Sequence, residues 1–192
     1  MIPGLTCDPL RHEWRDQYGV VPSVTQVLRE CGLIDGQWFT EEARLRGQYV
    51  AEATALIDDN DQLDEEDLHP ALLGYCKAWR GFKAESKCVI LGSEEQVSNA
   101  IYRYAGTLDR RVMLNGIETI VDIKTGAAAP WHGLQLAGYA GCFGFPLRRA
   151  GVYLRENGEY GLVTYADETD LPTFLSAVTM VHWKAKKGKG YE

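Results

Sequence analysis

The order of hydrophobic and polar positions divides the chain into a helical front and a β-rich middle. Ser23 can cap a short helix that carries Val24, Val27 and Leu28 on one face. Thr40 can cap a second helix, and a third is predicted over Pro70–Glu85. The inward stripe of the second helix consists mostly of small residues: Ala43, Gly47, Val50, Thr54 and Ile57. Close packing against this helix is therefore expected.

The middle of the chain predicts strands. Two strand-like runs, Ile101–Leu114 and Ile117–Lys124, flank Asn115-Gly116, which is the strongest short-range signal for a two-residue hairpin turn. A second hairpin is predicted over Gly151–Tyr165, around Asn157-Gly158. Two helices complete the pattern, one between the hairpins from Pro130 to about Cys142 and a last amphipathic one from Asp170 towards Lys187.

The chain has 192 residues, of which 45% are hydrophobic, enough for one sizeable core but too few for two comfortable domains. We expect one α/β domain with a mixed central sheet flanked by helices. It divides into a mainly helical part (1–90), a sheet core (91–165), and a C-terminal helix with a basic tail (166–192).

Cysteine usage and hydropathy indicate where in the cell the protein is expected. The five cysteines are an odd number with no close pair, so neither a disulfide framework nor a Cys-x-x-Cys metal knuckle is expected. No apolar run approaches the roughly 20 residues that span a bilayer, and the N-terminus lacks a basic region followed by an apolar stretch. These features predict a cytoplasmic protein without a membrane partner.

The formal net charge of −7 is a poor global match for a polyanion, so any contact with nucleic acid must use local basic clusters. The candidate clusters are Arg103, Arg110-Arg111, Arg148-Arg149 and the tail residues Lys184, Lys186, Lys187 and Lys189. The alternative for the tail is a solvated segment that aids solubility.

The first hairpin carries the chemical argument. If Leu114 pairs with Ile117, counting outward brings Asp109 opposite Asp122, and Lys124 shares their face. Opposed carboxylates repel each other unless a cation lies between them, and carboxylate oxygens are ligands for Mg²⁺ or Mn²⁺. The alternative is that these residues are ordinary charges on a solvated strand face.

Three motifs follow one another in the order Gly106-Thr107-Leu108-Asp109, Val121-Asp122-Ile123-Lys124-Thr125-Gly126, and Gln135 with Tyr139. In this combination the chain resembles the PD-(D/E)xK nuclease superfamily, and more narrowly its RecB-like, phage-type exonuclease branch. The resemblance implies a restriction-endonuclease-like core. It also implies that Asp109, Asp122 and the backbone carbonyl of Ile123 bind metal, and that Lys124 is catalytic.

Gln135 and Tyr139 match the branch's helical motif, in which they orient Lys124 or touch DNA. Their alternative is a surface glutamine and a half-buried tyrosine. Trp131 and His132 could contact a base or a phosphate, although a packed tryptophan and an uninvolved histidine are favoured.

The front helix departs from the resemblance at one position. Arg46-Gly47-Gln48-Tyr49-Val50-Ala51-Glu52 falls where relatives often have Arg-Gly-x-x-Val-His-Glu, so Ala51 replaces a histidine that could have reached the metal. Glu52 is the natural substitute ligand, although it points about 100° away from Ala51 around the helix. Glu94 is a second acidic candidate, ranked below Glu52.

Together these features predict a Mg²⁺-dependent deoxyribonuclease in which Mn²⁺ can substitute. The resemblance implies an exonuclease of phage or bacterial DNA recombination and repair. Arg110 and Arg111 are expected to contact the DNA backbone without sequence specificity, and a homo-oligomer or a recombination partner stays open. The alternative is a catalytically impaired DNA-binding or regulatory protein with the same fold, for which Ala51 is the main argument.

Overall fold

The computed structural model describes residues 1–8, 13–34, 40–64, 66 and 68–188. Its main sheet has five strands in the order β4-β5-β6-β7-β8. Only the β6–β7 pair is parallel within this sheet, so the predicted mixed α/β class is confirmed. The strands are β4 (Val89–Asn99), β5 (Tyr104–Leu114), β6 (Ile117–Lys124), β7 (Arg148–Leu154) and β8 (Tyr160–Thr164).

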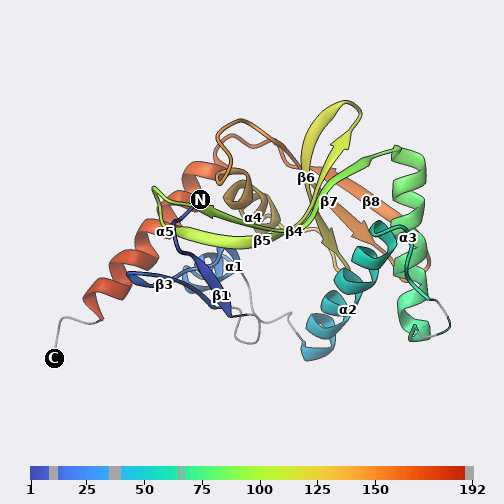
Figure 1. Cartoon of the computed structure of the whole chain (residues 1–192), viewed down its shortest axis with the longest axis horizontal. Helices are drawn as coiled ribbons and strands as arrows, with labels where there is room; N and C mark the ends of the chain where they lie inside the picture. The colour runs from blue at the N-terminus through green and yellow to red at the C-terminus, as the bar shows by residue number, and fades with distance from the viewer. Residues whose placement is uncertain (9–12, 35–39, 65, 67, 189–192) are drawn as a thin grey trace.

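Helices cover the sheet in two groups, as Figure 1 shows. One group packs residues such as Val50 and Trp79 against Val112 and Val121. The other packs Leu28, Leu136 and Phe174 against residues that include Ile120. The first group is α2 (Glu41–Asp58) with α3 (Pro70–Ser86), and the second is α1 (Val24–Glu30), α4 (Trp131–Ala140) and α5 (Asp170–Lys187). The sheet therefore separates two apolar cores.

The predicted helix starts are confirmed by their caps. Ser23 accepts the Gln26 backbone N–H at 3.1 Å and forms a reciprocal capping box with the Gln26 side chain. Thr40 accepts the Ala43 backbone N–H at 3.1 Å. These bonds satisfy backbone donors that the first helical turn leaves without partners.

Both predicted hairpins are also confirmed. Leu114 pairs with Ile117, and the register continues to Arg110 paired with Val121. Asn115 and Gly116 both have positive φ, 52° and 75°, as a tight turn between twisted strands requires. In the second hairpin, Leu154 pairs with Tyr160. Continuing the first register by one step places Asp109 beside Asp122.

The front of the chain is less helical than expected. It contains a three-stranded antiparallel sheet of β1 (Thr6–Asp8), β2 (Glu13–Asp16) and β3 (Gly19–Val21). Trp14 and Val21 bury themselves against Ile2 and Ala105 of β5. Strands of three or four residues are too short to show an alternating pattern, so hydrophobic periodicity could not reveal them. Among the described residues, no helix is long and apolar enough to cross a membrane.

Candidate active site

Asp109 lies where β5 begins to pair with β6. Its Oδ2 accepts the backbone N–H of Ile123 at 2.7 Å, just beyond the last paired residues, Arg110 and Val121. The carboxylate is thereby fixed against β6. Asp122 and Lys124 are two residues apart on β6 and share a face of the sheet.

Lys124 connects the strand to α4. Its Nζ lies 2.6 Å from Asp122 Oδ2 and donates to Gln135 Oε1 at 3.0 Å. Gln135 in turn donates through Nε2 to Thr25 Oγ1 at 3.3 Å and to the Tyr139 hydroxyl at 3.5 Å. A chain of polar contacts from α1 through α4 therefore holds the lysine ammonium beside Asp122.

Tyr139 requires the glycine of the first motif. The ring and Gly106 are so close that a Cβ on Gly106 would meet Tyr139 Cε1 at 2.8 Å. Tyr139 and Gln135 are each only 6% exposed. Both residues thus support Lys124 from inside the protein, which favours the orienting role over contact with DNA.

Asp122 is buried, and its closest charged partner is Lys124. The side chain is 4% exposed, and Oδ2 lies 2.6 Å from the Lys124 ammonium with no further donor among the described residues. Burial raises the pKa of Asp122 to about 6, with Asp109 and Glu94 adding to the rise and Lys124 opposing it. A carboxylate oxygen with one close partner keeps acceptor capacity for a second one, such as a cation.

Glu94, rather than Glu52, is the further carboxylate near this pair. The neighbouring strand pairs, Ser93 with Arg110 and Glu95 with Leu108, place Glu94 across from Asp109. Burial raises the pKa of Glu94, and the negative charge of Asp109 adds to the rise. Glu94, Asp109 and Asp122 therefore occupy neighbouring positions on β4, β5 and β6, while the Glu94 carboxylate itself pairs with Arg110 at 3.0 Å.

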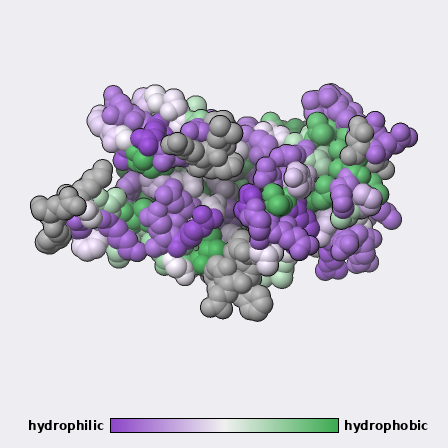
Figure 2. Space-filling view, turned by 90° about the horizontal axis from the view of Figure 1, so that it is seen from below, coloured by the Kyte–Doolittle hydropathy of each residue, from purple (hydrophilic) through white to green (hydrophobic). Residues whose placement is uncertain are grey.

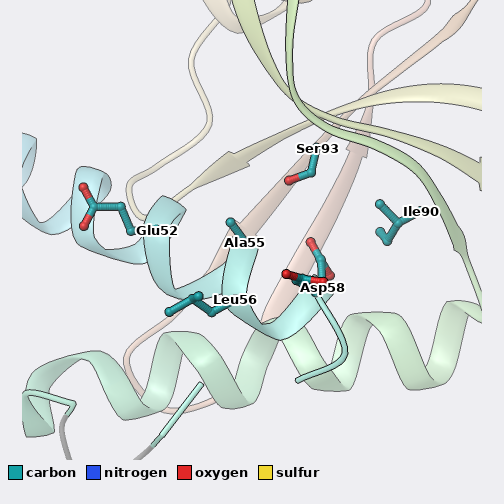
Figure 3. Close-up of a pocket in the computed structure, with 7 residues that line it drawn as sticks. Glu52, Ala55, Leu56, Asp58, Ile90 and Ser93 are labelled. Carbon is teal, nitrogen blue, oxygen red and sulfur yellow. The ribbon is translucent and has the colours of Figure 1, made fainter. Parts of the chain in front are cut away.

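Glu52 lies elsewhere. Its exposed side chain accepts a hydrogen bond from Gln48 on the same helix at 3.2 Å. It lines a pocket of about 660 Å³ between α2 and β4, together with residues that include Asp58 and Ser93, and Figure 3 shows its carboxylate pointing away from both. None of Asp109, Asp122 and Lys124 lines this pocket. The structure therefore does not bring Glu52 to the predicted metal site.

No three histidine, cysteine, aspartate or glutamate side chains in the described part of the chain lie close enough together to hold a metal ion alone. A metal between Asp109 and Asp122 would thus need backbone, water or substrate oxygens as further ligands. Mg²⁺ usually keeps several waters and binds through only one or two carboxylates. The residues present fit such an ion.

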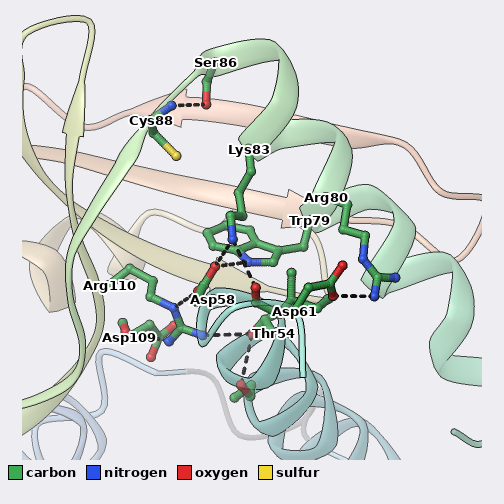
Figure 4. Close-up of polar contacts among 12 residues, drawn as sticks. Thr54, Asp58, Asp61, Trp79, Arg80, Lys83, Ser86, Cys88, Asp109 and Arg110 are labelled. Atoms are coloured by element: carbon green, nitrogen blue, oxygen red, sulfur yellow. Dashed lines mark hydrogen bonds and ion pairs between the residues drawn. The ribbon is translucent and has the colours of Figure 1, made fainter. Parts of the chain in front are cut away.

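Arg110 contradicts the expectation that it contacts DNA. Its side chain is 0% exposed and donates to Asp58 at 2.5 Å, to Glu94 at 3.0 Å and to Thr54 at 3.2 Å. The same guanidinium donates to the Asp109 carbonyl at 2.6 Å. Figure 4 shows Arg110 with Thr54 and Asp58, and Asp58 also contacts Lys83 and Trp79. Arg110 therefore fastens α2 to the strand that carries Asp109.

Arg111 is partly exposed, but its charge is already paired. It bonds Glu95 and Glu118, each at 2.7 Å, so it is a poor candidate for a phosphate contact. His132 is buried, and burial and the Lys124 charge lower its pKa to about 3. Its neutral ring contacts the Tyr153 hydroxyl and the Ala129 backbone N–H, which supports the packed, uninvolved role.

The hairpin register predicted that Asp109, Asp122 and Lys124 lie together, and the structure brings them together. Sequence reasoning missed the Asp58–Arg110 ion pair, since residues 52 positions apart give no local signal. It also missed Thr25 as the partner of Gln135, because a threonine in the first turn of a helix has no distinctive pattern.

Comparison with known proteins supports the fold. No protein-family model matches the chain, and no curated protein matches it in sequence. Among solved structures, the chain is similar to a crystal structure from Eubacterium rectale described as a "Putative exonuclease". The two share 16% identity with a TM-score of 0.51, over 86% of this chain and 74% of that one.

A second solved structure, named SSO0001, aligns at 15% identity and a TM-score of 0.34, over 82% of this chain and 84% of its own. This second likeness is too weak to carry an argument. The first shows a shared fold with mixed α/β architecture.

Proposed function

We propose that this chain is a metal-dependent nuclease that hydrolyses phosphodiester bonds in DNA. The observation that carries the proposal is the convergence of Asp109, Asp122 and Lys124 at the start of the β5–β6 pair, where the buried Asp122 carboxylate lies 2.6 Å from the Lys124 ammonium. The fold likeness to a protein described as an exonuclease agrees with it.

Asp109 and Asp122 would hold the metal, with the Ile123 carbonyl as the further ligand that the resemblance implies. Bound there, Mg²⁺ or Mn²⁺ would supply Lewis acidity and lower the pKa of a bound water. Glu94 faces the same pair and adds negative charge that attracts a divalent cation.

Lys124 is the residue that would act on the phosphate. Its side chain is 20% exposed, so it can reach a substrate while Gln135 fixes its position. A positive charge held in advance near a phosphate stabilises the negative charge that develops during hydrolysis. Thr25 and Tyr139 do not contact Lys124 in this chain of hydrogen bonds; they hold Gln135, which contacts it.

The test is cleavage of end-labelled single-stranded and double-stranded DNA with Mg²⁺, with Mn²⁺ and with EDTA. We expect metal-dependent cleavage that Lys124→Met reduces at least about 100-fold, because methionine keeps the length of the chain but lacks the charge. Lys77→Met, which removes an exposed lysine of α3, is the matched control. Equal activity of both variants would overturn the role of Lys124.

Exonuclease action is the finer part of the proposal. A covalently closed circular DNA, single-stranded or duplex, offers no ends, so an exonuclease should leave it intact while degrading the linear form of the same sequence. Cleavage of both forms at similar rates would show an endonuclease instead.

Ala51 supports a second candidate, a DNA-binding protein with impaired catalysis. Its methyl group cannot ligate a metal, and its carbonyl accepts the Thr54 hydroxyl at 2.9 Å. Binding of DNA without cleavage in either metal would favour this candidate, and Ala51→His would then be the variant expected to gain activity.

A further inference from the structure

Some basic side chains of this acidic protein form ion pairs and others do not. Hydrophilic residues cover most of the face shown in Figure 2, and most basic side chains contact a carboxylate. Those in ion pairs are Arg15, Arg44, Arg80, Lys83, Arg103, Arg110, Arg111, Lys124, Arg149 and Arg155. Over the described residues, the cations outside these ion pairs are Arg29, Arg46, Lys77, Lys87, Arg148, Lys184, Lys186 and Lys187.

Half of these remaining cations gather at one end of the molecule, where α1 and α5 finish. Lys184 donates to the Glu30 carbonyl at 3.0 Å, which ties the last turn of α5 to the last turn of α1. Arg29 lies in that turn of α1, and Lys186 and Lys187 follow Lys184 on α5. Glu30 contributes one negative charge there, so this end is locally basic although the whole chain is acidic.

An aromatic side chain lies among these lysines. Trp183 is 57% exposed and is three and four residues before Lys186 and Lys187, so the three side chains are neighbours on the helix surface. Exposure of a tryptophan on a helix whose opposite face is buried leaves a large apolar surface in water. A flat ring flanked by ammonium groups is complementary to a base and its phosphates.

The turn between β4 and β5 extends this surface. The His182 ring contacts the carbonyl oxygens of Tyr102 and Arg103, each at 3.0 Å, and thereby holds the turn against α5. Tyr102 is 40% exposed and Ile101 is 88% exposed. A second exposed ring thus lies next to the helix that carries Trp183.

We propose that this basic aromatic end, made of Arg29, Trp183, Lys184, Lys186 and Lys187, binds single-stranded DNA. The lysines would contact phosphates, and Trp183 would stack on a base. The choice of DNA as the ligand rests on the proposed function. The preference for single strands follows from the exposed rings, because the faces of paired bases in a duplex are stacked and cannot be contacted.

The turn next to this surface leads into β5, which carries Asp109. From Tyr104, at the end of the turn, to Asp109 is five residues of β5, or roughly 17 Å at the rise of a strand.

The test is binding of a fluorescently labelled oligothymidylate in EDTA, over a series of salt concentrations. For Lys186→Ala/Lys187→Ala we expect the slope of log affinity against log salt to flatten by about 1.4, since each single-strand phosphate contact contributes about 0.7. For Trp183→Ala we expect affinity to fall about tenfold. Lys77→Ala/Lys87→Ala removes the same charge at the far end of the molecule, on α3 and at its C-cap, and should change little.

Three results would overturn the proposal. The first is an equal loss in the α3 control, which would mean general charge attraction. The second is undiminished binding by Trp183→Ala or equally tight binding of duplex DNA. The third is concentration-dependent self-association in sedimentation that Trp183→Ala abolishes, which would assign the ring to a second copy of the chain.

These results are separable from failure of the proposed nuclease. Both surface variants keep Lys124, Asp109 and Asp122, so their effect on cleavage should appear as a higher KM for DNA. A protein that binds oligothymidylate as expected but cleaves nothing would refute the nuclease alone. Thermal unfolding of each variant checks that α5 stays folded.

Discussion

Replacing Asp122 by asparagine should stabilise the metal-free protein. Burial raises the pKa of this carboxyl from 3.8 to about 6, a difference of roughly two units, each equivalent to about 1.4 kcal/mol. With a raised pKa, the stability that protonated Asp122 contributes is fully present below pH 3.8 and is lost as the pH rises through about 6. Above pH 6 the ionised carboxylate therefore destabilises the fold by up to about 3 kcal/mol.

Asparagine keeps the shape of the side chain and does not ionise. Allowing for Lys124 left without its counter-charge, we expect a gain of about 1–3 kcal/mol near neutral pH, or a Tm higher by about 2–12 °C for a chain of this size. The gain should shrink below about pH 4, where Asp122 is protonated as well. Mn²⁺ should raise the Tm of the wild type and leave that of Asp122→Asn unchanged.

Thermal unfolding followed by circular dichroism, with EDTA and with Mn²⁺, measures both effects. Asp170→Asn is the matched control, because Asp170 is 13% exposed and pairs with Arg149 at 2.8 Å without lying at the site. Removing one partner of such a pair should lower the Tm in EDTA and leave the Mn²⁺ effect intact. The reasoning fails if Asp122→Asn is destabilised like the control, or if Mn²⁺ stabilises it as much as the wild type.

Three further changes test the surroundings of the site. Gln135→Met removes the acceptor that fixes Lys124, so cleavage should fall about 10- to 100-fold while DNA binding in EDTA stays unchanged; an unaffected rate would exclude a positioning role. Gly106→Ala forces a Cβ within 2.8 Å of the Tyr139 ring and should cost about 1–3 kcal/mol of unfolding free energy in denaturant titrations, whereas a neutral effect would mean that the ring moves freely. In calorimetric titration, Glu94→Gln should weaken Mn²⁺ binding and Glu52→Gln should not, and the opposite order would restore Glu52 as the ligand.

Much of the fold could be predicted because its signals are local. A cap such as Ser23 or Thr40 and a turn such as Asn115-Gly116 act through neighbouring backbone atoms, so the sequence contains the whole interaction. The strands of the front sheet could not be predicted, because three or four residues carry too little pattern and their pairing depends on tertiary contacts with Ala105.

In the candidate site, too, the features with local signals could be predicted and those that depend on tertiary contacts could not. The register that brings Asp109 to Asp122 follows from one turn, and the two-residue spacing on β6 follows from strand geometry. The fate of Arg110 could not be predicted, because its burial depends on Asp58, which reaches it from α2 only after the sheet and helices have packed. The positive charge of Arg110 is neutralised by Asp58, a partner distant along the chain, so it is not free to contact DNA.

The central claim, that Asp109, Asp122 and Lys124 form a metal-dependent nuclease site, is tested most directly by DNA cleavage in defined metals. Purified wild-type protein and Lys124→Met are incubated with end-labelled linear DNA in Mg²⁺, in Mn²⁺ and in EDTA. The account predicts degradation by the wild type in metal, none in EDTA, and a loss of at least about 100-fold in the variant. Cleavage that persists in EDTA, or that Lys124→Met leaves intact, would contradict it.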